Sequence, residues 1–254
     1  MAEHPVIACY RGPDSVGALQ LAATLAQVLD QPLVLAAAYR YEPVALGASP
    51  LPSAADDRRA AAAQDAVERA HELLGARTEV REEVVAAQDV AAGLSDLARD
   101  LDACVLVLGR DVAGHVVADV IVQASCPVAV SPFDVVVPGL QPVARVAVAV
   151  ADDGSPAALL ALVAAQRIAA LSHGGPPQRL TMAENAGSGL AAASEAYDLL
   201  VCGSRGRGRL RAALLGSVSS HLVAAARCPV LVVGPDVRAA PGRPLGLSTA
   251  TTNH

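Results

Sequence analysis

One pattern of residues occurs twice along the chain, so the fold must be one that two similar units can build. Three landmarks recur in the same order: an apolar run followed by a turn with Gly and Asp, an apolar run ending in glycine, and a run opened by Cys-Pro-Val. They lie at 6–15 and 146–156, at 105–109 and 199–203, and at 126–130 and 228–232. Such self-similarity indicates an internal repeat.

The two copies differ in length, and each has lost residues in a different place. The landmark pairs are Gly12 and Gly154 at an offset of 142 positions, Gly109 and Gly203 at 94, and Cys126 and Cys228 at 102. The second copy has therefore lost 48 residues from its middle. The first copy has lost 8 residues between Gly109 and the pair Cys126-Pro127.

Within the first copy, runs rich in Val and Leu alternate with helical patterns. The predicted strands lie near 5–10, 33–39, 79–85, 104–109 and 127–131, and the helices near 15–29, 55–75, 90–100 and 115–124. This order predicts an α/β fold, a parallel sheet covered on both faces and joined by right-handed crossovers. Because aromatic residues are only 2% of the chain, the core must be built from Ala, Val and Leu.

The second copy is expected to repeat this unit in abbreviated form, without one strand–helix pair. Its predicted strands lie near 144–150, 179–183, 199–203 and 229–233, and its helices near 156–171, 187–196 and 217–227. We therefore expect a first domain over 1–132 and a second over 144–235. Residues between them carry prolines typical of a linker, and the composition of 236–254 predicts a disordered tail.

The last strand of each copy, near 127–131 and 229–233, is apolar and would form an exposed sheet edge. Exposed apolar edges promote unwanted association. We therefore expect the two copies to pair with each other through these strands, within one chain. A homodimer of whole chains remains open at this point.

Charge and cysteine content exclude several classes of partner. The net charge is −6, which argues against general affinity for nucleic acid or anionic membranes. The chain has 5 cysteines, no C-x-x-C pair and no lysine, so we expect buried thiols in a reducing compartment and no lysine-based catalysis. The N-terminus has no signal-like segment and no apolar run could span a bilayer, which favours the cytoplasm.

A glycine-rich segment carries most of the functional information. Gly203-Ser204-Arg205-Gly206 follows a predicted strand, and Gly216-Ser217 precedes a predicted helix. Glycines let a backbone approach an anion, and the free N–H groups of a first helical turn point toward it. The segment therefore predicts a site for a phosphate-bearing small molecule.

These residues resemble the universal stress protein family in its tandem-domain form. Nucleotide-binding members of that family carry G-x-x-G, nine residues, and then G followed by Ser or Thr, which this segment matches without a gap. The turn at Asp153-Gly154-Ser155 and the closing Cys-Pro-Val strand also resemble the family. The resemblance implies two tandem Rossmann-like domains of the adenine-nucleotide α-hydrolase kind, an ATP or related nucleotide site, dimerisation through the last strand, and a regulatory stress role.

The candidate ligand-binding residues are Asp153, Gly203, Arg205, Gly206, Gly216, Ser217 and Ser219. The glycines would bend the loop and permit close approach, and the serines would donate to phosphate, with Ser217 also a natural N-cap. Arg205 could pair with phosphate oxygens, whereas a solvated basic loop explains Arg207, Arg209 and Arg211 better. By resemblance Asp153, or Asp152 beside it, contacts the nucleoside; the alternative is that Asp153 is a turn residue that caps the following helix.

The first copy is expected to be a scaffold without a ligand. Arg11 stands at the aspartate position, His115 stands where Ser217 stands in the second copy, and only four residues separate Gly109 from Gly114. Such a short turn cannot wrap a triphosphate.

Three functions remain open from the sequence. The first is a regulatory module that binds ATP or another phosphate-bearing ligand at the second domain. The second is an interaction or dimerisation protein that binds no nucleotide, favoured by the deletion in each copy. The third is a slow nucleotide hydrolase, for which no positioned base or metal carboxylate pair is evident. If the shortened second copy leaves about 150 Å² of a bound base unburied, the free energy of binding becomes less favourable by about 4 kcal/mol.

Overall fold

The computed structural model describes residues 3–42, 44–46, 49–75, 80–110, 115–132, 143–150, 155–181, 186–204, 216–234, 237 and 244–245. Strands and helices alternate through both halves, as the repeat predicts. The elements of the first half are β1 (Val6–Cys9), the 3-10 turn η1 (Pro13–Ser15), α1 (Val16–Leu29), β2 (Leu33–Arg40), β3 (Val44–Leu46), β4 (Ser49–Leu51), α2 (Ala54–Leu74), β5 (Val80–Ala87), α3 (Val90–Asp100), β6 (Val105–Gly109), α4 (His115–Gln123) and β7 (Val128–Ser131).

The second half repeats the scheme with fewer elements. They are β8 (Val146–Val150), α5 (Pro156–Leu171), β9 (Gln178–Thr181), α6 (Ala186–Ala193), the 3-10 turn η2 (Ser194–Ala196), β10 (Leu199–Gly203), α7 (Ser217–Ala225) and β11 (Val230–Val233). Among the described residues, α2 and β5 have no counterpart here, because α6 precedes β10 and packs on α7 as α3 precedes β6 and packs on α4. The predicted abbreviation is thus present in the fold.

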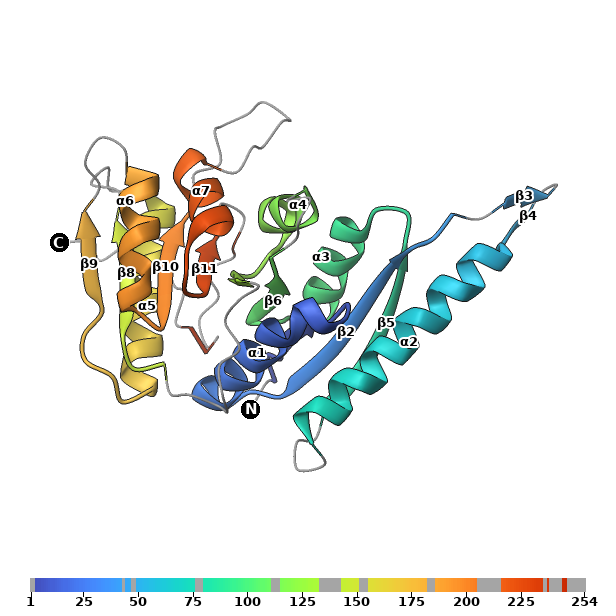
Figure 1. The fold of residues 1–254 in the computed structure, drawn as a ribbon, viewed down its shortest axis with the longest axis horizontal. Coiled ribbons are helices and arrows are strands. Elements are labelled where there is room, and N and C mark those ends of the chain that lie inside the picture. The colour runs from blue at the N-terminus through green and yellow to red at the C-terminus, as the bar shows by residue number, and fades with distance from the viewer. Residues whose placement is uncertain are drawn as a thin grey trace.

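Nine strands form one sheet in the order β5-β2-β1-β6-β7-β11-β10-β8-β9. Neighbouring strands within each half are parallel. The halves meet where β7 and β11 pair antiparallel, with Val130 opposite Val230 and Val128 opposite Val232. The predicted contact between the two last strands therefore exists inside the chain, and we call this junction the seam (Figure 1).

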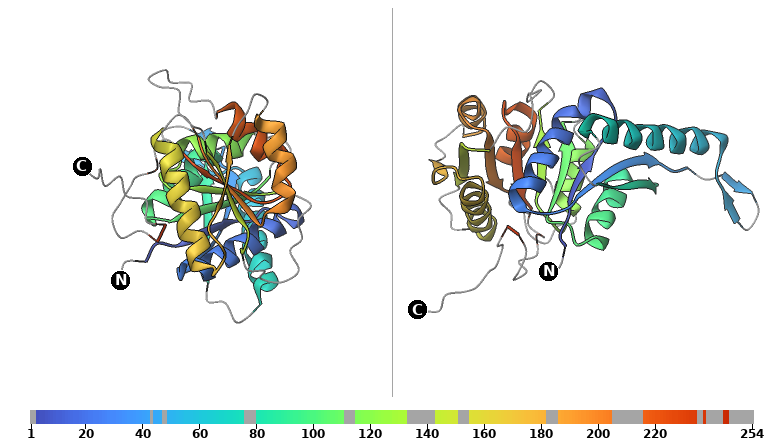
Figure 2. Two further views of the ribbon diagram at one scale, coloured as in Figure 1. Left: turned by 90° about the vertical axis from the view of Figure 1, so that its left-hand side faces the viewer. Right: turned by 90° about the horizontal axis from the view of Figure 1, so that it is seen from below.

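Helices cover both faces of the sheet (Figure 2). One buried cluster joins α1, α2 and α5 to the sheet, and the other joins α3, α4, α6 and α7 to the opposite face. Both clusters run through the strands on either side of the seam. Ala, Val and Leu dominate both, as the scarcity of aromatic residues requires, and small side chains let the helices lie close to the sheet.

The sequence pattern predicts no strands between 39 and 55, yet β3 and β4 form an antiparallel hairpin there, with Val44 opposite Leu51. The hairpin lies at the far end of α2, beyond the body of the sheet (Figure 1). Strands of three residues separated by two residues carry too short an alternation pattern to be recognised.

The segment expected to be a disordered tail contributes to the fold at two described positions. Val237 and Leu245 are buried in the cluster beneath α5, and Arg167 of α5 donates from Nε to the carbonyl of Pro244 at 3.2 Å. These contacts place residues 237, 244 and 245 against the core.

The loss of one strand leaves β9 as the outer strand of the second half. In the first half, β5 pairs along the corresponding edge of β2 over eight residue pairs. β9 has only four residues, includes Arg179 and follows Pro176 and Pro177. Short length, charge and proline all discourage further strand pairing, so the exposed edge is protected.

None of the five cysteines forms a disulfide bond, and four of them are buried. No group of three or more His, Cys, Asp or Glu residues able to hold a metal ion occurs among the described residues. Within the same residues, no helix combines the length and apolarity needed to cross a bilayer.

Helix α2 begins with a capping box in which Asp56 is the central acceptor. Its carboxylate accepts hydrogen bonds from the backbone N–H of Glu42 and of Ser53, both at 2.9 Å, and from the Ser53 hydroxyl at 2.7 Å. These bonds, with the Glu42 bond the largest contribution, lower the pKa of Asp56 from 3.8 to about 2. The ionised carboxylate therefore holds the start of α2 against the end of β2.

We expect this carboxylate to make stability depend on pH. Its folded pKa lies below its unfolded value, so its contribution is complete above about pH 4 and disappears as pH falls toward 2. Urea unfolding at a series of pH values should show that Asp56→Asn is destabilised near neutral pH and approaches the parent chain toward pH 2. The exposed neighbour Asp57 is the control: a constant gap for Asp56→Asn, or an equal effect of Asp57→Asn, would contradict the assignment.

Candidate phosphate-binding site

Within each half, the chain builds the sheet first on one side of the first strand and then on the other side. The strand order therefore reverses between the first strand and its neighbour toward the seam. In the second half this reversal lies between β8 and β10, which pair through Leu199 with Val146 and Cys202 with Ala149. Ligands of open α/β sheets bind at the carboxyl ends of the strands at such a point. Gly203, the last residue of β10, lies there.

Helix α7 begins near the same end of the sheet. Its N-cap is Gly216, not Ser217 as predicted, and glycine has no side chain that could accept from the first turn. The first backbone bond of the helix runs from Ser220 N–H to the Gly216 carbonyl at 2.8 Å, so the preceding N–H groups of the first turn have no partner within the helix. By contrast, Ser53, Asp89 and Ser155 cap α2, α3 and α5 with their side chains.

The two candidate serines lie in different environments. Ser217 is exposed at the first helical position, where its hydroxyl and backbone N–H can reach a ligand. Ser219 is buried, and its hydroxyl donates to the Gly203 carbonyl at 3.3 Å. Ser219 therefore joins the first turn of α7 to the end of β10.

The same hydroxyl contacts the thiol of Cys202. Burial raises the pKa of Cys202 to about 12, and the hydrogen bond with Ser219 opposes the rise. The thiol thus stays protonated, which excludes it as a nucleophile at neutral pH.

Gly203 is required for packing. A Cβ at this position would lie 2.6 Å from the carbonyl carbon and oxygen of Ala157, in the first turn of α5. At the equivalent Gly109 the nearest atom would be 3.5 Å away. Gly203 therefore allows α5 to approach β10 closely, a role that the sequence analysis did not assign.

Asp153, Arg205 and Gly206 lie outside the described residues. The N-cap of α5 is Ser155, whose hydroxyl accepts a hydrogen bond from Ala158 N–H at 3.3 Å. Helix α5 therefore does not require Asp153 as its cap. The described part of the site thus comprises Gly203, Gly216, Ser217 and Ser219, gathered around the end of β10.

The equivalent region of the first half holds a cavity of about 160 Å³ lined by Tyr10, Arg11, Ser15, Gly109 and Arg110, among others. This volume is below the range of roughly 300–1,000 Å³ typical of small-molecule sites. Arg11 N–H donates to the Ser15 hydroxyl at 3.3 Å. The guanidinium of Arg110 instead crosses the seam and donates to the carbonyl of Ala226, after the end of α7.

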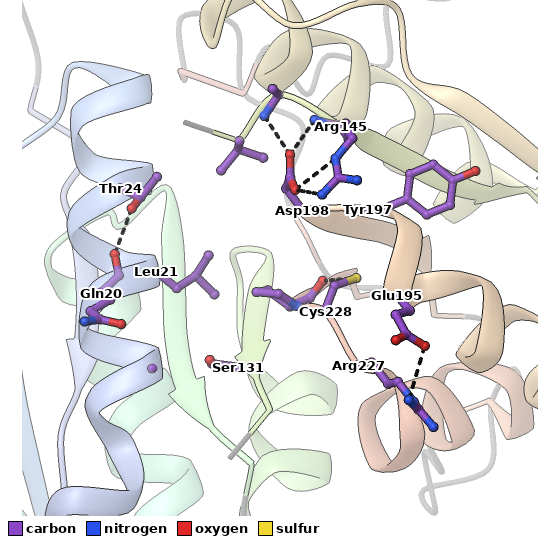
Figure 3. Close-up of a pocket in the computed structure, with 14 residues that line it drawn as sticks. Gln20, Leu21, Thr24, Ser131, Arg145, Glu195, Tyr197, Asp198, Arg227 and Cys228 are labelled. Carbon is purple, nitrogen blue, oxygen red and sulfur yellow. Dashed lines mark hydrogen bonds and ion pairs between the residues drawn. The ribbon is translucent and has the colours of Figure 1, made fainter. Parts of the chain in front are cut away.

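A larger cavity, of about 510 Å³, lies elsewhere (Figure 3). It is lined by one face of α1, by Ser131 at the end of β7, and by the segments that enter β8, β10 and β11. The sequence analysis did not anticipate it. No single segment carries a signal for it, because residues from both halves meet there only in the folded chain.

These features define a two-repeat α/β protein whose second repeat has the start of a helix beside the reversal point of its strand order. Residues 188–234 match the model of the Universal stress protein family. The match runs from α6 through β11, so it includes the glycine-rich segment and α7. It covers the second repeat only.

Solved structures support the fold over almost the whole chain. A universal stress protein from Archaeoglobus fulgidus DSM 4304 aligns with a TM-score of 0.65 and 16% identity, over 91% of this chain and 96% of that chain. A functionally unknown protein from Pseudomonas aeruginosa PAO1 aligns with a TM-score of 0.60 and 13% identity, over 92% and 94%.

A universal stress protein from Archaeoglobus fulgidus in complex with dAMP aligns with half of the chain. Its TM-score is 0.40 and its identity 20%, over 50% of this chain and 97% of that chain. A search of curated proteins gave no match.

Proposed function

We propose that this chain is a regulatory protein that binds an adenine nucleotide at the second repeat, with the phosphate at the first turn of α7. The observation that carries the proposal is the position of that turn. Its N-cap, Gly216, has no side chain, and the turn lies beside the end of β10 at the strand-order reversal. Backbone N–H groups and the helix dipole favour an anion there.

The family match supports the same assignment, because residues 188–234 contain the whole glycine-rich segment. On this proposal, Gly206 and Arg205 complete the loop, Asp153 contacts the nucleoside, and ATP is one candidate ligand. We place the protein in the cytoplasm and regard it as a binding protein and not an enzyme. The missing strand–helix pair predicts weak affinity, since less of the base would be buried.

A scaffold function is the second candidate, and the Arg110 contact favours it. In the first repeat, the residue after the loop glycine contacts the other repeat and leaves the strand-end region with a cavity of only about 160 Å³. If the second repeat has also lost its ligand, the chain would act through its surface.

Calorimetric titration with dAMP, AMP and ATP tests the proposed function. The informative variant is Ser217→Asp, because Ser217 is exposed at the first position of α7. An acidic side chain there stabilises the helix by about 0.3–1 kcal/mol but repels a phosphate. We expect nucleotide affinity to fall at least about tenfold while thermal stability is kept or raised.

Ala54→Asp is the matched control, because Ala54 is exposed at the first position of α2. It adds the same charge at another helix start and should leave affinity unchanged. If no binding is measurable at about 5 mM nucleotide, the affinity is weaker than that of any useful site. The scaffold function would then be the remaining candidate. Equal affinity of Ser217→Asp and the parent chain would exclude α7 as the phosphate site.

A further inference from the structure

The cavity of about 510 Å³ at the seam has the volume of a small-molecule site, and such sites often lie between domains. It lies at the amino ends of β8, β10 and β11. The glycine-rich segment lies at the opposite, carboxyl ends of these strands. The cavity is therefore separate from the proposed nucleotide site, and its function does not depend on that proposal.

One wall of the cavity is a face of α1, formed by Gly17, Gln20, Leu21 and Thr24. These positions follow helical spacing, so their side chains share one side of the helix. Leu21 is buried, and the Thr24 hydroxyl donates to the Gln20 carbonyl at 2.9 Å. Leu21 is the apolar side chain of this wall, and the Thr24 hydroxyl is already satisfied as a donor.

The floor is also largely apolar. Val143 and Cys228 are buried, and Pro229 follows directly in the segment that enters β11. The thiol of Cys228 donates to the Pro229 carbonyl at 3.4 Å, and burial raises its pKa to about 12. An apolar ligand body would find matching surface here, with no buried charge beside it.

A fixed ion pair lies at the rim (Figure 3). Arg145 donates to Asp198 Oδ1 through Nε at 3.2 Å and Nη2 at 2.8 Å. The other oxygen, Oδ2, accepts the backbone N–H groups of Ala144 at 3.1 Å and Arg145 at 2.7 Å. Asp198 thus accepts four hydrogen bonds from the protein.

Arg145 has more N–H donors than its two bonds to Asp198 use. A guanidinium has five N–H groups, and the bonds to Asp198 use its Nε side. The end-on edge, formed by Nη1 and the second hydrogen of Nη2, keeps the fork geometry that binds a carboxylate through two parallel bonds. The Asp198 contact also raises the pKa of Arg145, so the fork stays charged.

The second ion pair at the rim, Arg227 with Glu195 at 3.1 Å, adds no net charge. Two positive and two negative groups therefore surround the opening. A dianionic phosphate would find no second unbalanced cation, whereas a monocarboxylate needs only the one fork. From this donor excess above an apolar floor, we infer that the seam cavity binds a small monocarboxylate with an apolar body, held by Arg145.

Calorimetric titration of the full chain with octanoate and with octanol tests this inference. Both probes have the same apolar chain, and only octanoate has the carboxylate. We expect octanoate to bind at least about tenfold more tightly than octanol. Arg145→Met should remove this preference and leave octanol binding unchanged, because methionine keeps the apolar stem and lacks the fork.

Two further variants make the outcome specific. Gln20→Trp places a large ring in the cavity from an incompletely buried position of α1 and should abolish binding of both probes. Arg99→Met is the matched control, because Arg99 is an exposed arginine paired with Asp96 outside the cavity, and it should change neither affinity. Urea unfolding verifies that each variant is folded.

The opposite results overturn the inference. They are no octanoate binding at about 5 mM, equal affinities for octanoate and octanol, or octanoate affinity that is unchanged in Arg145→Met or in Gln20→Trp. None of these outcomes bears on dAMP binding, which is measured at the other end of the strands.

Discussion

Gly203→Ala should destabilise the protein by about 2–3 kcal/mol, the upper range for overpacking. A Cβ at this position would lie 2.6 Å from the backbone carbon and oxygen of Ala157. Because the obstructing atoms are backbone, no side-chain rotation can relieve the contact. Either α5 shifts as a whole or β10 leaves its register, and both changes disturb the core beneath them.

The internal repeat supplies the control for this experiment. Gly109 ends β6 as Gly203 ends β10, but a Cβ there would have its nearest neighbour at 3.5 Å, an ordinary contact. Gly109→Ala should therefore change the free energy of unfolding by less than about 1 kcal/mol. Urea denaturation of the two variants measures the difference, and equal effects would show that close approach of α5 is not the reason for glycine at 203.

Arg110→Met should weaken the seam by about 1.5–3 kcal/mol, the value of a hydrogen bond from a charged group. The Arg110 guanidinium donates to the Ala226 carbonyl, and Ala226 is buried. Removing the donor leaves that carbonyl without the bond. It also removes a positive charge from the C-terminal end of α7, where the helix dipole favours one.

Urea unfolding again gives the measurement, and amide hydrogen exchange locates the effect. Protection should fall in α7 and β11 more than in β1 and β2, since the lost contact lies at the seam. Arg99→Met removes an exposed arginine that pairs within α3 and should cost less than about 0.5 kcal/mol. A uniform loss of protection, or a loss no larger than that of Arg99→Met, would contradict a seam role for Arg110.

Much of the fold could be predicted because the signals were local and occurred twice. The alternation of Val- and Leu-rich runs with helical patterns located the strands and helices, and α3, α5 and β10 begin and end where they were predicted. The seam followed from the need to cover two apolar edges. The hairpin of β3 and β4 was missed because its strands are too short to show a period.

The site was only partly predictable. The glycine spacing predicted a ligand site at Gly203 and the start of α7, and this stays a prediction, whereas the packing roles of these residues depended on tertiary contacts. Gly203 lies against Ala157, and Ser219 donates to Gly203, although neither partner is near in sequence. Helix α7 begins at residue 217 as predicted, but its N-cap is Gly216 and not Ser217. Asp153, Arg205 and Gly206 stay predictions.

The seam also has a consequence for how a duplicated chain evolves. In a dimer of separate subunits, dilution separates the partners, and every substitution appears in both. Here β7 and β11 belong to one polypeptide, so their association is intramolecular and does not depend on protein concentration. Each repeat can then change alone, and Arg110, a residue of the first repeat, forms a hydrogen bond that holds the second repeat in place.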